Sequence, residues 1–319
     1  MACRPESVDP SVCCQDPVDR LELLPRGFDY AVQFTGIRSS HRPLSNQQYC
    51  HFSLNTAAGT HDISRTIQPS FRRPKINWRI SLPTILLTGA NRGIGLELVR
   101  QYVSDGWTVI ATCRDPESAS DLTAISGNIT IRKLDVQQYD HISQLAAEIR
   151  ETPIDVLFSN GAIGAPRDPD DSSVTFGDID VPLLLDYFRT NTIGPIKLTE
   201  AFLPNVLASV QKKIVFMSSR GASLTERGNL PHHKPGGNYS YRVSKAALNA
   251  ASRSLAFDLR PQGVTVLTLN PGWVRTRMGG DDADLSVSFS VENMRRIIHS
   301  SNLEETGSFF EYDGTALSW

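Results

Sequence analysis

Tyr241 and Lys245 stand four residues apart, and their types and spacing could do acid–base chemistry. Residues at positions i and i+4 share one face of a helix, so a helix here brings the phenol and the ammonium together. A free phenol has a pKa of about 10, and a neighbouring cation lowers that value toward neutral pH. The pair is therefore a candidate acid for a carbonyl oxygen. The plain alternative is a surface tyrosine beside a solvated lysine.

Other polar residues are weaker candidates when each is taken alone. Tyr239 has Val243 as its i+4 neighbour, which can neither tune a phenol nor hold a sugar hydroxyl. Ser219 follows an apolar stretch and could be an ordinary serine at a strand end, while Asn191 could be a helix cap. Adjacent histidines, His232 and His233, lie in a stretch rich in Pro and Gly, where solvated or substrate-facing side chains are more common than metal ligands.

A second chemical signal is the stretch "TGANRGIG" at residues 88–95, which follows the apolar run "TILLT" and precedes an amphipathic helix. Glycine lets the backbone turn tightly and approach a pyrophosphate, and the helix N-terminus offers free N–H groups to the anion. Gly89, Gly93 and Gly95 therefore predict a dinucleotide site. A turn without a ligand is the alternative for three glycines considered in isolation.

A fold must position these residues, and the sequence pattern from Ser81 onward predicts which fold it is. Apolar strands alternate with amphipathic helices, which predicts an α/β fold: a Rossmann-type, doubly wound parallel sheet with helices on both faces. Strands are expected within residues 84–89, 107–113, 129–136, 154–162, 212–219 and 263–272. Residues 81–319 are expected to form one domain, with any ligand at the carboxyl edge of the sheet.

The glycine spacing and the motifs that follow it resemble the short-chain dehydrogenase/reductase family. These motifs occur in the family's order: "LDV", "SNGA", "NTIG", "MSS", "YRVSK" and "PGWVRT". The resemblance implies a catalytic set of Asn191, Ser219, Tyr241 and Lys245. In it Tyr241 is the acid, Ser219 binds the substrate oxygen, Lys245 also holds the ribose, and Asn191 holds a water.

The resemblance also implies a nicotinamide cofactor bound by residues from several loops. The expected cofactor-binding residues are Gly89, Asn91, Arg92, Gly93, Ile94, Gly95, Arg114, Asp135, Val136, Asn160, Gly161, Ala162, Tyr241, Lys245, Pro271, Gly272, Val274 and Thr276. Arg114 and Arg92 favour NADP, because a guanidinium pairs with the 2′-phosphate. Asp115 keeps NAD as the alternative, since an acid there would accept hydrogen bonds from the ribose.

Within the family, the stretch from Tyr239 to Gly280 and the ending "GSFFEYDGTALSW" are most similar to the C-factor and sniffer-like carbonyl reductase branch. The expected function is transfer of a hydride between NADP(H) and a carbonyl or alcohol. The alternative is a C-factor-like signalling or interaction protein that binds the cofactor without required turnover. A homodimer through the helix of Tyr241, whose Ala247, Ala250 and Ala251 allow close packing, is left open beside a monomer.

Composition limits which binding partners and which cellular location we expect. A formal net charge of −2 gives no field for nucleic acid or an anionic membrane. No apolar run long enough for a membrane span and no secretory signal are visible. Five cysteines without CxxC spacing argue against a disulfide framework or zinc site, so we expect no metal and a cytoplasmic location.

Residues 1–80 differ from the rest, because they are polar and show no sustained period. We expect a low-order extension, with a targeting or docking role or an incorrectly assigned start site as open explanations.

Two departures from the family's pattern stand out. Asn-Asn-Ala-Gly is here Ser159-Asn160-Gly161-Ala162, so a methyl group stands where the backbone packs on the cofactor. The stretch between Ser219 and Tyr241 is longer than usual, which predicts an elaborated loop beside the substrate. A small lid with one helix is expected between Thr276 and the last strand.

Overall fold

The computed structural model describes residues 53–56, 59–62, 82–164, 174–228 and 237–319. The chain divides into two units, Met1–Trp78 and Arg79–Trp319. In the first unit, strand β1 (Ser53–Thr56) pairs antiparallel with β2 (Gly59–Asp62). No strand was predicted here, since four residues are too few to show an alternating pattern. The remainder of the expected extension lies outside the described residues.

The second unit is built on one seven-stranded sheet in which every pair of neighbouring strands is parallel. Its strands are β3 (Thr84–Thr88), β4 (Thr108–Cys113), β5 (Ile129–Lys133), β6 (Val156–Ser159), β7 (Lys213–Met217), β8 (Thr265–Asn270) and β9 (Ser308–Glu311). Their order in the sheet is β5-β4-β3-β6-β7-β8-β9. Unbroken apolar runs suit strands that are covered on both faces, and β3, β6, β7 and β8 are buried throughout. The predicted doubly wound fold is confirmed.

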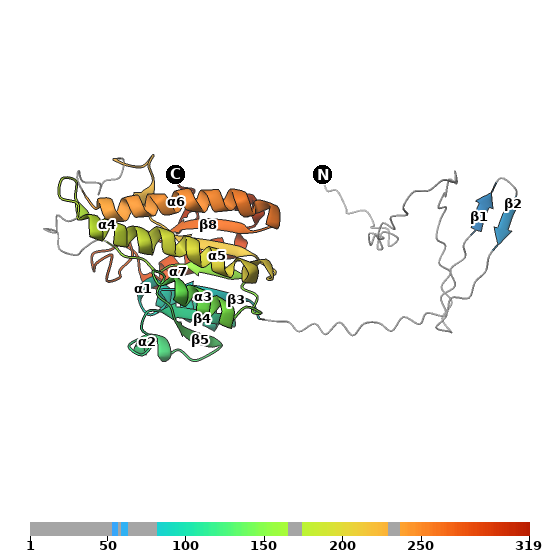
Figure 1. The fold of residues 1–319 in the computed structure, drawn as a ribbon, viewed down its shortest axis with the longest axis horizontal. Coiled ribbons are helices and arrows are strands. Elements are labelled where there is room, and N and C mark those ends of the chain that lie inside the picture. The colour runs from blue at the N-terminus through green and yellow to red at the C-terminus, as the bar shows by residue number, and fades with distance from the viewer. Residues whose placement is uncertain (1–52, 57–58, 63–81, 165–173, 229–236) are drawn as a thin grey trace, which may run out of the picture. The chain divides into compact units, whose positions relative to one another are not determined.

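Helices cover both faces of this sheet (Figure 1). The longer ones are α1 (Gly93–Ser104), α3 (Tyr139–Glu148), α5 (Gly194–Leu207), α6 (Tyr239–Leu259) and α7 (Val287–Ser300). Leu98 of α1 and Met294 of α7 share one core cluster with the sheet. Phe202 of α5 and Leu248 of α6 belong to the cluster on the other face. The helix predicted in the lid is α7.

Two short helices and one π-turn complete the frame. The helices are α2 (Ser120–Thr123) and α4 (Val181–Phe188). The π-helix η2 (Arg189–Ile193) joins α4 directly to α5 and contacts α6. A π-turn inside a helical run is often found at a functional site. Among the described helices, none combines the length and apolar character that a membrane span requires.

The strand order reverses at β3, whose neighbours are β4 on one side and β6 on the other. Loops leaving a reversal point diverge, and the crevice between them is where open α/β sheets bind ligands. The loop after β3 stays close to β4, because the Ala90 N–H donates to the Thr112 carbonyl at 3.0 Å. The candidate residues after β3, β4, β6, β7 and β8 therefore share one edge.

Candidate active site

The glycine loop is packed so tightly that side chains would not fit at two of its glycines. Gly89 has φ +68°, and a Cβ there would lie 2.8 Å from the Gly161 Cα. A Cβ on Gly95 would overlap the Gly89 carbonyl oxygen and lie 2.8 Å from the Asn160 amide nitrogen. This packing fixes the turn of Asn91, Arg92 and Ile94 at the start of α1, a backbone cradle whose helix N-terminus suits a pyrophosphate.

Asn160 ties the loop after β6 to the glycine loop. Its side-chain Nδ2 donates to the carbonyl oxygens of Thr88, at 3.1 Å, and Gly89, at 3.3 Å. The Thr88 hydroxyl in turn accepts from the backbone N–H groups of Asn160 and Gly161, both at 3.1 Å. Thr88 was not singled out in the sequence, although a buried hydroxyl at a strand end is a usable signal.

The inverted Gly161-Ala162 pair is accommodated. The close approach to Gly89 is made by Gly161, and a Cβ on Gly161 would meet its nearest neighbours only at 3.5 Å. The position that cannot carry a side chain is therefore Gly89 on the opposite loop. How the Ala162 methyl group meets the cofactor stays a prediction.

Three arginines converge beside the cradle. Burial lowers the pKa of Arg92, and the positive charges of Arg277 and Arg114 lower it further. The third arginine is brought here by its own loop, since a Cβ on Gly93 would lie 3.5 Å from Thr276 Cγ2, next to Arg277. Like charges gathered at one point favour an anion. Sequence reasoning missed Arg277, because its loop is distant in the chain.

Asp135 and Val136 follow β5 on the same edge. The Asp135 carboxylate accepts from the Gln137 N–H at 3.0 Å, which fixes the turn into α3. Val136 packs against Gly194 at the start of α5 so closely that a Cβ on that glycine would lie 2.9 Å from the valine. Both predicted residues thus stand at the β5 end of the crevice.

The segment after β8 closes the crevice from the other side. Gly272 has φ +78°, and a side chain there would collide with Leu285 and Tyr312. The Thr276 hydroxyl accepts from the Gly279 N–H at 3.1 Å and so shapes the turn, and Pro271 accepts at its carbonyl from Ser290. The Val274 side chain is buried, and its expected contact with the cofactor stays a prediction.

Tyr241 and Ser219 meet at the end of β7. Asn238 caps α6 and accepts from the Tyr241 N–H at 3.3 Å, which places the tyrosine in the first turn. Although part of the residue is exposed, burial of the phenol raises its pKa, and the hydrogen bond with the Ser219 side chain acts in the opposite direction. The direction expected from a neighbouring cation was wrong, since desolvation of the phenolate is the larger effect.

Lys245 lies beneath this pair and is 2% exposed. Its ammonium donates to the Met217 carbonyl at 2.7 Å, and its Nζ lies 6.0 Å from the centre of the Tyr241 ring. Burial lowers the pKa of Lys245 from 10.5 to about 7. The lysine is therefore poised to change charge near neutral pH, which a solvated surface lysine would not do.

Asn191 is fully buried in the π-turn η2. Its side chain accepts from the Ile163 N–H at 2.8 Å and donates to the Ile163 carbonyl at 2.9 Å and to Ser244 Oγ at 3.0 Å. These bonds join the loop after β6 to α6. The amide of Asn191 thus helps to fix the site, and its expected role in holding a water stays a prediction.

Comparison with known proteins identifies this arrangement. The profile of the short chain dehydrogenase family matches residues 83–284. The chain belongs to the short-chain dehydrogenase family.

Relatives of this family match between half and three quarters of this chain. C-signal of Myxococcus xanthus is 38% identical over 174 residues, which are 54% of this chain and 98% of that protein. An uncharacterised oxidoreductase of Schizosaccharomyces pombe is 30% identical, over 73% of this chain and 96% of that protein. The predicted family and its C-factor and sniffer-like branch are confirmed.

Two solved structures share the fold. The NADPH-bound carbonyl reductase from chicken fatty liver is 30% identical with a TM-score of 0.68, covering 75% of this chain and 99% of that chain. The carbonyl reductase Sniffer of D. melanogaster is 35% identical with a TM-score of 0.66, covering 75% of this chain and 100% of that chain. From its family and its oxidoreductase relatives, we conclude that this short-chain dehydrogenase is an oxidoreductase.

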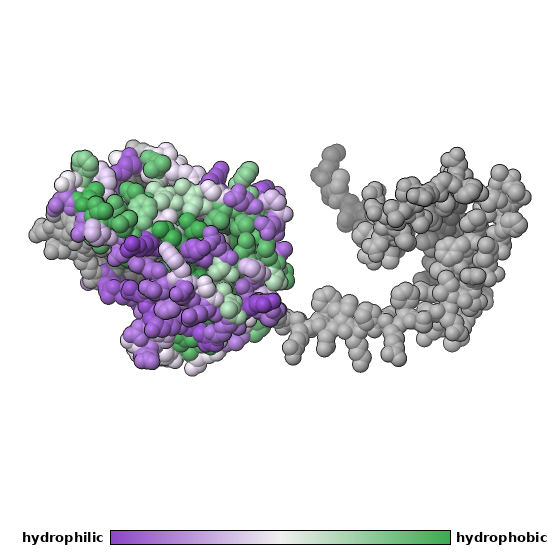
Figure 2. Space-filling view, in the orientation of Figure 1, coloured by the Kyte–Doolittle hydropathy of each residue, from purple (hydrophilic) through white to green (hydrophobic). Residues whose placement is uncertain are grey.

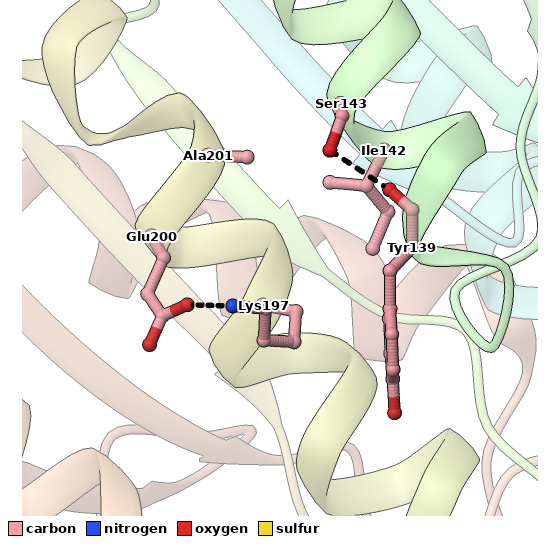
Figure 3. A pocket seen from close by; sticks show the side chains of 6 residues that line it. All are labelled: Tyr139, Ile142, Ser143, Lys197, Glu200 and Ala201. Atoms are coloured by element: carbon pink, nitrogen blue, oxygen red, sulfur yellow. Dashed lines mark hydrogen bonds and ion pairs between the residues drawn. The ribbon is translucent and has the colours of Figure 1, made fainter.

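One surface hollow and the other sequence candidates complete the description. A surface hollow of about 240 Å³ between α3 and α5 is lined by residues such as Tyr139, Ser143 and Lys197, none of them a candidate residue (Figure 3). His232 and His233 fall outside the described residues. Tyr239 turns toward Phe176, with ring centres 5.7 Å apart. Within the described ranges, no three His, Cys, Asp or Glu side chains gather as metal ligands would.

Proposed function

We propose that this short-chain dehydrogenase is an NADP(H)-dependent carbonyl reductase that converts a ketone, aldehyde or quinone to the alcohol. The observation that carries the proposal is the meeting of Tyr241, Ser219 and Lys245 at the carboxyl edge of β7, on the same edge as the glycine cradle. An acid beside a dinucleotide cradle is what carbonyl reduction needs.

The residues at the edge fit a nicotinamide dinucleotide phosphate. Gly89, Gly93 and Gly95 let the loop turn tightly onto the start of α1, whose N–H groups suit the pyrophosphate, and the cluster of Arg92, Arg114 and Arg277 fits a 2′-phosphate. Asp115 is exposed and keeps NAD as a poorer alternative. Two of the solved relatives were determined with NADP or NADPH bound, which supports the same choice. When bound, the cofactor supplies or accepts the hydride at its nicotinamide ring.

Tyr241 provides the proton. In reduction, the carbonyl carbon gains a hydride and the carbonyl oxygen gains the phenolic proton, which solvent later replaces on Tyr241. Because burial raises the pKa of this phenol, the tyrosine stays protonated at neutral pH and is ready to donate. The Ser219 hydroxyl, which also accepts from the Gly221 N–H at 3.1 Å, orients the carbonyl oxygen toward the phenol.

Lys245 and Asn191 hold and tune this acid. A protonated Lys245 stabilises the phenolate left after proton donation and binds the ribose hydroxyls. Asn191 fixes the Ile163 backbone and α6 relative to each other, which sets the distance between the cofactor loops and Tyr241. Both residues therefore act on the same proton, one by charge and one by position.

A panel of carbonyl compounds tests the proposal. We expect the purified chain to oxidise NADPH in the presence of at least one aldehyde, ketone or quinone, and to use NADH much less efficiently. Each reaction is followed by loss of nicotinamide absorbance, with product alcohol identified by mass. No turnover with either cofactor across the panel would refute the enzyme's proposed reaction.

The similarity to C-signal supports a second candidate, a signalling or interaction protein that binds the cofactor without turnover. The two candidates differ in what they require of Tyr241. If a Tyr241→Phe protein loses NADPH oxidation but retains the chain's role in the cell, the second candidate is favoured.

We propose a homodimer as the assembly, through the face that carries α4 and α6. Figure 2 shows hydrophobic residues gathered over the region of α4, α5 and α6. Val181, Leu185, Val243 and Phe257 are exposed there, and Phe257 is 81% exposed. Light scattering of the wild-type chain and of a Phe257→Glu, Val243→Glu variant tests this: a dimer that becomes a monomer is expected, and a wild-type monomer contradicts it. A cytoplasmic location stays a prediction.

A further inference from the structure

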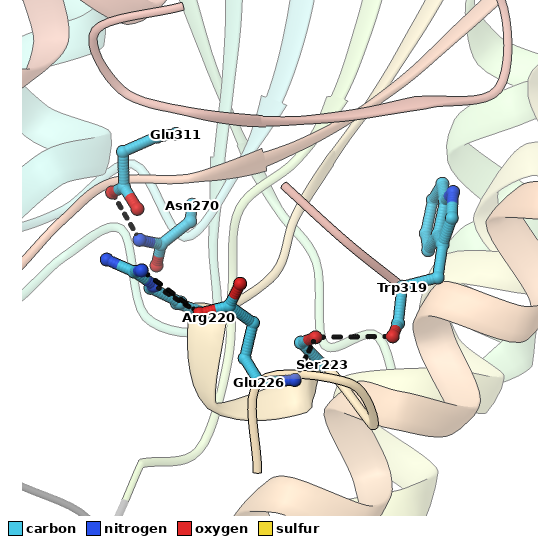
Figure 4. Close-up of polar contacts among 6 residues, drawn as sticks. All are labelled: Arg220, Ser223, Glu226, Asn270, Glu311 and Trp319. Carbon is cyan, nitrogen blue, oxygen red and sulfur yellow. Dashed lines mark hydrogen bonds and ion pairs between the residues drawn. The ribbon is translucent and has the colours of Figure 1, made fainter. Parts of the chain in front are cut away.

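The last residues of the chain fold back along β9 and reach the neighbourhood of Ser219. After β9 the chain turns at residues 311–315, where the Glu311 N–H donates to the Thr315 carbonyl at 2.8 Å. The returning segment is tied to β9 by the Leu317 N–H, which donates to the Phe309 carbonyl at 2.8 Å. This path brings Trp319 to the loop that follows β7 (Figure 4).

The main-chain oxygen of Trp319 is the acceptor for one short segment of that loop. It accepts from the N–H groups of Leu224 and Thr225, each at 3.1 Å, and from the hydroxyls of Ser223 at 3.2 Å and Thr225 at 3.0 Å. The Trp319 ring packs on Phe309, with ring centres 5.3 Å apart, and under the Arg253 guanidinium at 5.6 Å. Ring and oxygen thus connect β9 and α6 to residues 223–225.

The segment held in this way follows the proposed catalytic serine, Ser219, after one short turn. Ser219 caps the short 3₁₀ turn Arg220–Ala222, and the Ser223 N–H donates to the Arg220 carbonyl at 3.1 Å. Ser223 is 2% exposed, and its hydroxyl also accepts from the Glu226 N–H at 3.1 Å. Arg220 closes the turn through an ion pair with Glu226 at 3.0 Å.

A buried carboxylate supports the same turn from the side of the sheet. Glu311 ends β9, accepts from the Asn270 side chain, and lies close enough to Arg220 for that charge to lower its pKa against the larger effect of burial. Arg220 is therefore paired with Glu226 on its own loop, and its charge also acts on Glu311 at the end of β9. The turn after Ser219 is fixed by contacts from the chain's last strand and tail.

We propose that Thr315–Trp319 is a latch, held by Trp319, that positions the turn after Ser219 and with it the start of the substrate loop. Trp319 is a positioning residue in this account, which rests on the proposed function. Within the described ranges, Trp319 contacts β9, α6 and residues 223–225, and these contacts do not involve the glycine loop or the arginine cluster. The latch should therefore affect the carbonyl substrate and leave NADPH binding unchanged.

Deletion of Trp319 in the full chain tests the latch by a split between two Michaelis constants. We expect KM for the carbonyl to rise about five- to tenfold, the effect of losing a net hydrogen-bond anchor, while KM for NADPH stays within about twofold. Trp319→Phe keeps the main-chain oxygen and an aromatic ring and should restore most of the loss. Ser318→Ala, at an exposed neighbouring position, is the matched control and should match the wild type.

Limited trypsin digestion tests the same latch without an activity assay, because it measures how fast the chain is cleaved beside the held segment. Cleavage after Arg227, just beyond the held segment, should become several-fold faster in the deletion and in Ser223→Ala, which removes one donor to Trp319 and also the acceptor of the Glu226 N–H. Should the deletion fail to fold, Ser223→Ala decides the matter. Wild-type cleavage rates in the variants, or equal rises of both Michaelis constants, would overturn the latch. If the wild-type chain reduces no carbonyl, the proposed reaction fails, while the digestion still decides the latch.

Discussion

At the scale of residues, the site depends on two side chains whose burial shifts their pKa values in opposite directions. Tyr241 is held protonated because burial raises its pKa, and Lys245 gives up its proton more easily because burial lowers its pKa to about 7. The tyrosine is therefore a ready acid, while the charge that supports it depends on pH.

This difference predicts the pH dependence of reduction. A base whose pKa is lowered to about 7 is charged below that pH and neutral above it, so the stabilising ammonium is lost as the pH rises. We expect kcat/KM for the carbonyl, which reports groups of the free enzyme, to fall as the pH rises through about 7. Lys245→Arg should lose this break in its residual activity, because a guanidinium stays charged. A flat profile between about pH 6 and 9 would contradict the role of Lys245.

Arg277 makes a prediction of its own about the choice of cofactor. Arg277→Gln removes one of three charges at the proposed 2′-phosphate site, so KM for NADPH should rise about tenfold or more while KM for NADH stays nearly constant. Arg275 is the control, because it lies two residues away and donates to the Ala283 carbonyl at 3.0 Å. The prediction fails if Arg275→Gln and Arg277→Gln change the ratio of the two constants equally.

At the scale of elements, the site is set by how closely the loop after β3 packs on the loop after β6. Gly95→Ala would press a methyl group against the Gly89 carbonyl, while Gly161→Ala meets only ordinary contacts at 3.5 Å. We expect Gly95→Ala to lower the free energy of unfolding by about 1–3 kcal/mol and to weaken NADPH binding. Gly161→Ala should stay within about 0.5 kcal/mol of the wild type. Urea unfolding and NADPH fluorescence titration measure both, and the reverse order of the two variants would refute this packing.

The elements were largely predictable, because the central strands of the large sheet are apolar runs and the glycine motif follows directly after one of them. The stretch "TILLTG" became β3 and its turn, and Tyr241 and Lys245 fell on α6 at the expected spacing. What could not be predicted depends on tertiary contact. Arg277 reaches Arg92 only because the lid folds over Gly93, and the pKa of Tyr241 follows from burial that no spacing encodes.

At the scale of the whole molecule, the family resemblance concerns the oxidoreductase unit and does not extend to the first eighty residues. Solved relatives cover 75% of this chain and 99–100% of their own length, so they have no counterpart of the remaining segment. We propose that residues 1–80 are an extension outside the catalytic domain of residues 81–319. A chain that starts at Arg79 should keep its unfolding temperature and a kcat/KM within about twofold. A large loss of either quantity would show that the extension contributes to the domain.

The central claim is that Tyr241 donates the proton in a hydride transfer to a carbonyl, and one paired measurement tests it most directly. NADPH oxidation with the best carbonyl of the panel is compared for wild type, Tyr241→Phe and Tyr239→Phe, with NADPH binding as the control for folding. We predict that Tyr241→Phe binds NADPH normally and loses about a hundredfold or more in kcat, as removal of a general acid does, while Tyr239→Phe loses only a few-fold. Equal losses in the two variants, or full turnover by Tyr241→Phe, would contradict the account.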